Sequence, residues 1–152
     1  MNIIKNKNIL GESPLWNHLN NKLYWVDIES YKIKCFDDHK VSEFLISKKP
    51  TSIHINDINT LFCSLEDGLG IYDFRNNKFN YLKKIDDNYI RFNDGKCDKN
   101  GILHIGTICK KKPREKIAKI YKYNNNFLEE IIDNISNANG ISFNSKNEMF
   151  FS

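Results

Sequence analysis

The chain has 152 residues, of which 40% are hydrophobic and 28% charged, and a formal net charge of +4. This length allows one domain with its own core, and the composition is that of an ordinary soluble protein. The sequence contains no signal-like apolar stretch, no bilayer-length apolar run and no CxxC or zinc-finger cysteine spacing. We therefore expect a reducing, cytoplasmic setting and no membrane partner.

One cluster of basic residues, KKKPREK at positions 110–116, could indicate a nucleic-acid or phosphate-binding patch. The cluster contains a proline and follows a strand-like run. We interpret it as a solvated loop and expect no nucleic-acid partner.

In chain order, short apolar runs alternate with Asn-rich turns, which favours strands; two helical candidates, 112–120 and 127–133, are too short and poorly capped. The strands are expected at 23–27, 31–36, 51–55, 61–64, 70–74, 78–82, 102–107, 120–123, 127–132, 140–143 and 148–152.

These strands form a repeat. The first apolar residues after equivalent turns are Leu23, Leu61, Ile102 and Met149, at separations of 38, 41 and 47 positions. Repeats of roughly 40–50 residues with about four short strands are typical of propeller blades. The pattern predicts an all-β partial β-propeller over residues 1–152, with about three blades and the start of a fourth. A two-sheet sandwich with coincidental spacing is the alternative.

A closed propeller needs at least four blades, and this sequence stops directly after the apolar run 149–151. An open blade face would leave apolar surface and backbone groups unpaired. We therefore expect the N-terminal half of a longer propeller, completed by self-association or by a complementary half-chain.

The stretch 90–107 brings a basic residue, two side chains with amide or carboxylate oxygens and a turn glycine into five positions. Arg91, Asn93 and Asp94 precede the turn glycine Gly95 and lead into an alternating strand. Polar groups on a loop at the mouth of a strand are a common way to present a binding site. The bland alternative is a simple turn at 93–95, with Arg91 paired to Asp94.

Three motifs together resemble one family. They are LGESPLW at 10–16 with LYWVDI at 23–28, RFNDGKCD at 91–98 with Gly101 and Gly106-Thr107, and ISNANGISF at 135–143. Their order and sequence are similar to those of the gluconolactonase family, which includes regucalcin (senescence marker protein) and luciferin-regenerating enzyme.

The resemblance implies a six-bladed propeller with one divalent cation in its central channel. Two of the family's three metal ligands map onto Glu12 and Asn139. The third, an Asp that is also the favoured general base, belongs to a segment after Ser152, so no catalytic residue is assigned. The family's substrate contacts map onto Arg91 and Asn93, and a further one onto Glu115 in a divergent loop.

The residue types agree with this chemistry, because carboxylate and amide oxygens suit Ca²⁺ or Mg²⁺ and tolerate Zn²⁺ or Mn²⁺. Our first hypothesis is metal-dependent hydrolysis of a small-molecule sugar lactone. The alternatives are a calcium-binding regulator without turnover and an inactive partial propeller. A protein-binding propeller of the WD type lacks its Trp-Asp dipeptide here.

Overall fold

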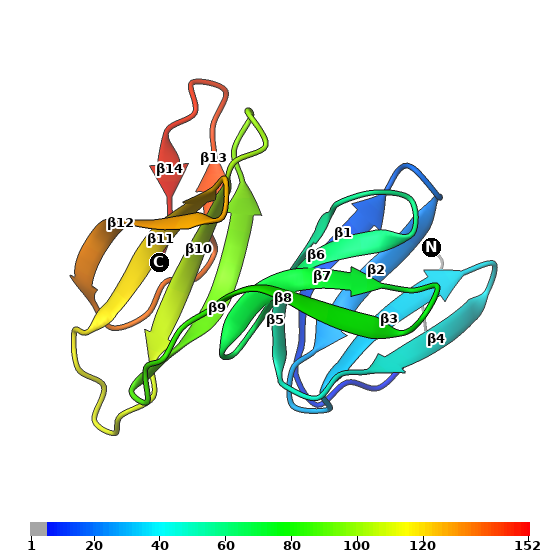
Figure 1. Cartoon of the computed structure of the whole chain (residues 1–152), viewed down its shortest axis with the longest axis horizontal. Helices are drawn as coiled ribbons and strands as arrows, with labels where there is room; N and C mark the ends of the chain where they lie inside the picture. Colours follow the sequence, from blue (N-terminus) through cyan, green and yellow to red (C-terminus); the bar gives the residue numbers. More distant parts are fainter. Residues whose placement is uncertain (1–5) are drawn as a thin grey trace.

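A computed structural model describes residues 6–152, so residues 1–5 of the domain expected over 1–152 lie outside the described part. Within the described residues, all regular secondary structure is β-strand (Figure 1). In the same part of the chain there is no helix long and apolar enough to cross a membrane.

Three four-stranded sheets follow one another along the chain, and each is an antiparallel meander in sequence order. Blade 1 contains β1 (Gly11–Asn17), β2 (Lys22–Asp27), β3 (Lys32–Asp37) and β4 (Lys40–Leu45). Blade 2 contains β5 (Pro50–Ile55), β6 (Thr60–Leu65), β7 (Gly68–Asp73) and β8 (Lys78–Lys84). Blade 3 contains β9 (Ile90–Cys97), β10 (Leu103–Cys109), β11 (Ala118–Asn124) and β12 (Phe127–Ile135). A hairpin of β13 (Ser142–Phe143) and β14 (Met149–Phe150) forms the partial blade 4.

The same turn recurs between the first two strands of every blade. An Asn or Asp side chain there accepts a hydrogen bond from the backbone amide two residues later, at 2.7–3.0 Å. Such Asx turns give a backbone amide a local hydrogen-bond acceptor, and they end one strand before the next begins. The four residues are Asn17, Asp57, Asp98 and Asn144.

The blades stack face to face. Apolar residues of blades 1 and 2 form one buried cluster that includes Val26 and Leu61. Leu69 of blade 2 packs with Phe92 of blade 3, and Ile120 of blade 3 packs with Ile141 beside the partial blade 4. Successive stacking of separate sheets is the propeller arrangement, and it rules out the two-sheet sandwich.

The first strand of each blade lies on the inner side of the arc, with β1 packed beside β5 and β5 beside β9 (Figure 1). Side chains of these inner strands that do not enter a blade core face the space between them. This is where the polar residues of the sequence motifs come together.

The structure adds three strands that the sequence patterns did not indicate, namely β1, β4 and β9. The stretch that begins at Ile90 was expected as a loop before a strand, and this is wrong: 90–97 is itself the inner strand of blade 3. The two tryptophans differ in burial: Trp16 of β1 is 56% exposed, whereas Trp25 of β2 is buried.

Candidate functional site

The inner strand of blade 1 bulges at the point where it reaches the site. Ser13 and Pro14 together oppose the single residue Trp25 of β2. Ser13 is left-handed, with φ of 52°, and its Oγ accepts a hydrogen bond from the Ile53 amide of blade 2 at 3.0 Å. Bulges redirect side chains. The neighbouring Glu12 is exposed and borders the space between the inner strands.

The inner strand of blade 3 has a matching bulge, where Asn93 and Asp94 together oppose Gly106 of β10. The expected turn at 93–95 is therefore a bulge inside a strand. Phe92 and Gly95 on either side of it remain buried, so the core face continues through the irregularity. The bulge leaves two consecutive polar side chains outside the core.

Arg91 does not pair with Asp94. Its Nη1 donates to the carbonyl oxygen of Phe92 at 2.8 Å and to Asn93 Oδ1 at 3.2 Å. Asp94 accepts from the next backbone amide at 2.8 Å through Oδ1 and from the Ile141 amide at 2.9 Å through Oδ2. Asp94 thus connects β9 to the segment entering β13. Among the described residues, most N–H groups of Arg91 have no acceptor.

Asn93 holds the segment that carries Asn139. Its Nδ2 donates to Asn137 Oδ1 at 3.2 Å and to the Ala138 carbonyl oxygen at 3.0 Å. Ala138 is fully buried against Gly106, where an added Cβ would lie 2.4 Å from the Ala138 Cβ. Glycine is therefore required at 106 for this close approach.

Two cavities, of about 200 and 370 Å³, lie along the inner strands. Four residues border both of them: Glu12, Ser13, Asp94 and Asn139. The smaller cavity is also bordered by Arg91, Asn93 and Arg114. The structure therefore brings Glu12 of β1, Arg91 and Asn93 of β9, and Asn139 of the segment before β13 to one place.

Glu115 does not border these cavities. Its carboxylate pairs with Lys111 at 2.8 Å on an exposed part of the loop, and its amide donates to Cys109 Sγ at 3.4 Å. The preceding residue, Arg114, reaches the smaller cavity instead. Arg114 was not among the residues predicted from the sequence; its one signal there is the basic loop that directly follows the strand β10.

The smaller cavity is bordered by two arginines and two carboxylates, Arg91, Arg114, Glu12 and Asp94. Burial lowers the pKa of Arg91, the Glu29 and Glu66 carboxylates act in the opposite direction, and the positive charge of Arg114 lowers it further.

Within residues 6–152, no group of three or more His, Cys, Asp or Glu side chains could hold a metal ion. Glu12 and Asn139 still fit a hard cation in donor type, since in this part of the chain neither side chain has a hydrogen-bond partner and both border the same cavities. Oxygen ligands of this kind suit Ca²⁺ and Mg²⁺. Of the three protein ligands that the family resemblance implies, the described residues supply these two.

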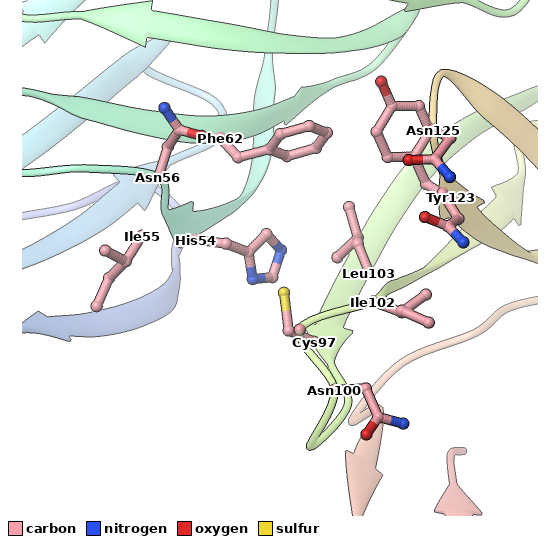
Figure 2. Close-up of a pocket in the computed structure, with 12 residues that line it drawn as sticks. His54, Ile55, Asn56, Phe62, Cys97, Asn100, Ile102, Leu103, Tyr123 and Asn125 are labelled. Atoms are coloured by element: carbon pink, nitrogen blue, oxygen red, sulfur yellow. The ribbon is translucent and has the colours of Figure 1, made fainter.

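A further cavity of about 320 Å³ lies between blades 2 and 3, at the other end of the inner strands (Figure 2). His54, at the end of β5, borders both this cavity and the larger of the two described above. The ring is 8% exposed, and burial together with the charge of Lys96 lowers the pKa of His54 to about 4. Its Nε2 lies 3.3 Å from Ser52 Oγ. A neutral, buried imidazole is consistent with a structural role.

Comparison with known proteins assigns the family. The sequence pattern described as "SMP-30/Gluconolactonase/LRE-like region" matches residues 10–152. The chain belongs to this family. The resemblance inferred from the three motifs is thereby confirmed.

Among curated relatives, the chain is 30% identical over 148 residues to the Bacillus subtilis protein named "Putative sugar lactone lactonase YvrE", covering 94% of this chain and 50% of that protein. It is 24% identical over 159 residues to human regucalcin, covering 93% of this chain and 50% of regucalcin. The chain thus spans about half the length of these relatives.

Solved structures confirm the propeller fold. A calcium-binding regucalcin from Agrobacterium tumefaciens matches with a TM-score of 0.90 and 19% identity, over 97% of this chain and 51% of that chain. A gluconolactonase from Xanthomonas campestris matches with a TM-score of 0.77 and 15% identity, over 96% and 55%. At these identities the likeness concerns the fold.

Proposed function

We propose that this chain contributes to the metal-dependent hydrolysis of a sugar lactone. The observation that carries the proposal is the meeting of Glu12, Asn139 and Arg91 at one cavity between the inner strands. Membership of the lactonase family and the 30% identity to the Bacillus subtilis relative support the same reaction class.

In this proposal Arg91 binds the sugar. Its Nη1 donates to two acceptors of its own strand, and its remaining N–H groups can donate to substrate hydroxyl or carbonyl oxygens. Asn93 donates both of its amide hydrogens within the protein, so it offers the substrate only an acceptor. Its main contribution is to orient Arg91 and the backbone before Asn139.

Glu12 and Asn139 would hold the divalent cation. When bound, such a cation supplies Lewis-acid polarisation of a lactone carbonyl. Asp94 is not assigned a catalytic role, because both of its carboxylate oxygens already accept backbone N–H groups within the protein. Proton transfer to Asp94 is therefore not part of the proposal.

The test is the hydrolysis of D-glucono-δ-lactone, followed with a pH indicator above the spontaneous rate, after EDTA treatment and after addition of Ca²⁺, Mg²⁺, Zn²⁺ or Mn²⁺. We expect an ion-dependent rate that is lost in Glu12→Gln and strongly reduced in Arg91→Gln. Glu129→Gln, an exposed carboxylate outside the cavities, is the matched control. A rate that survives EDTA would remove the metal from the proposal.

Cation binding without turnover is the second candidate. Both oxygens of Asp94 accept backbone amides, so Glu12 is the one carboxylate without a hydrogen-bond partner among the described residues that border both cavities. A free carboxylate at this place favours cation binding. Calorimetry that detects Ca²⁺ binding, together with no hydrolysis of any lactone offered, would support this candidate over the first.

A further inference from the structure

Two arginines face one small cavity without a carboxylate partner. The chain contains three arginines, and Arg75 forms an ion pair with Asp73 at 2.7 Å. Within residues 6–152, neither Arg91 nor Arg114 forms an ion pair, although both border the cavity of about 200 Å³. This contrast indicates that the guanidinium groups of Arg91 and Arg114 can bind an anionic ligand in this cavity.

The acidic residues near these arginines are already engaged. Glu29 pairs with Lys49 at 2.7 Å, and Glu66 accepts from the Lys49 amide at 3.5 Å. Asp94 receives two backbone amides. Glu12 is the remaining carboxylate on this cavity, and under the proposed function its charge is used to hold a cation.

The positive charge of Arg114 also lowers the pKa of Arg91, although the Glu29 and Glu66 carboxylates act more strongly in the opposite direction. Like charges held close together are unfavourable unless a ligand compensates them. Guanidinium groups bind carboxylate and phosphate with forked, charge-assisted hydrogen bonds.

We propose that the substrate carries an anionic group, a carboxylate or a phosphate, in addition to its lactone ring, and that Arg114 together with Arg91 binds this group. The inference rests on the proposed function and narrows its substrate class from sugar lactones to acidic sugar lactones. Arg114 is then a specificity-determining residue, supplied by the loop between β10 and β11.

Ring opening itself creates one carboxylate, so binding of any sugar acid would not distinguish this proposal from simple product binding. The informative comparison is between acids with one and with two anionic groups. Isothermal titration calorimetry with D-gluconate, D-glucarate and 6-phospho-D-gluconate makes this comparison directly. D-Glucarate tests a carboxylate as the second anionic group, and 6-phospho-D-gluconate tests a phosphate.

We expect at least one of the doubly anionic acids to bind about tenfold more tightly than D-gluconate at low salt, since charge-assisted hydrogen bonds are the strong ones. Arg114→Gln should remove this preference, and Arg114→Lys should keep part of it. Lys116→Gln changes the net charge equally in the same exposed loop, outside the cavity, and should keep the preference.

Equal affinity for the three acids, equal losses in Arg114→Gln and Lys116→Gln, or no binding of any acid would each overturn the inference. Hydrolysis of D-glucono-δ-lactone without a preference for doubly anionic acids would reject the inference and leave the proposed function standing. Preferential binding of a doubly anionic acid without hydrolysis of any lactone would reject the proposed function and, with it, an acidic sugar lactone as the substrate, and would leave the two arginines as an anion-binding site.

Discussion

Asn93 donates from Nδ2 to the carbonyl oxygen of Ala138 at 3.0 Å, and so holds the backbone one residue before Asn139. This bond links the proposed substrate contact on β9 to the proposed metal ligand. We predict that Asn93→Ala weakens cation binding about tenfold, the lower range for losing a residue that orients a ligand. Calorimetry with Ca²⁺ measures it, and unchanged affinity would show that Asn139 does not depend on Asn93.

Glu12→Gln should abolish cation binding and leave the fold intact. The Glu12 side chain is exposed and has no hydrogen-bond partner among the described residues, so its charge is dispensable for the stability of the fold. We expect Ca²⁺ to raise the melting temperature of the wild type, because a ligand that binds only the folded state stabilises it, and to leave that of Glu12→Gln unchanged. A similar Ca²⁺-induced shift in both proteins would exclude Glu12 as a ligand.

Gly106→Ala should separate blade 3 from the segment before β13. The added Cβ would lie 2.4 Å from that of Ala138, and overpacking of this kind costs about 1–3 kcal/mol. Urea unfolding measures the loss. The double variant Gly106→Ala with Ala138→Gly should recover part of it, and failure to recover any would show that the contact with Ala138 is not the cause.

The buried ion pair of Asp27 and Lys34, 3.3 Å apart, secures the chain before β1. Burial alone would raise the pKa of Asp27, but hydrogen bonds from the Leu10 amide, Ser30, the Ile9 amide and Lys34 outweigh it and hold the pKa below its ordinary value. Asp27→Ala leaves the Ile9 and Leu10 amides and the Ser30 hydroxyl without their acceptor, whereas Lys34 keeps Glu43 at 3.2 Å. We expect a loss of about 3 kcal/mol in unfolding free energy, since each unsatisfied donor costs about 1–3 kcal/mol.

The ion pair of Lys119 and Glu130, 2.5 Å apart, is the control for the buried pair, because both of its side chains are substantially exposed. Lys119→Ala should change the unfolding free energy by about 1 kcal/mol or less. Losses of equal size at Asp27 and Lys119 would contradict the importance of the buried pair.

His54 should make the protein less stable in mild acid. Its pKa is about 4 when folded, against 6.5 ordinarily, so the unfolded chain takes up the proton first as the pH falls. Its contribution is complete above about pH 6.5, decreases between 6.5 and 4, and amounts to roughly 3 kcal/mol in total. Urea unfolding at several pH values should show this slope reduced in His54→Gln; an identical slope would contradict it.

The sequence predicted the repeat and most strands, because turn residues such as Asp57 and Asp98 act locally and leave a direct signal. It also placed Glu12, Asn93 and Asn139 in one site through their motifs. It misassigned β9, because a bulge at Asn93–Asp94 breaks the alternation that identifies a strand. It missed Arg114, because the loop position of that side chain depends on tertiary packing.

The bulge in β9 also has a genetic consequence. Ile90 and Phe92 are buried before it, and Gly95 is buried after it, so the core face needs only one residue between Phe92 and Gly95 and the strand contains two. Loss of one codon at 93–94 would return β9 to regular alternation and keep the same residues in the core. The blade would still pack, and the space between the inner strands would lose one of the two polar side chains that the bulge provides.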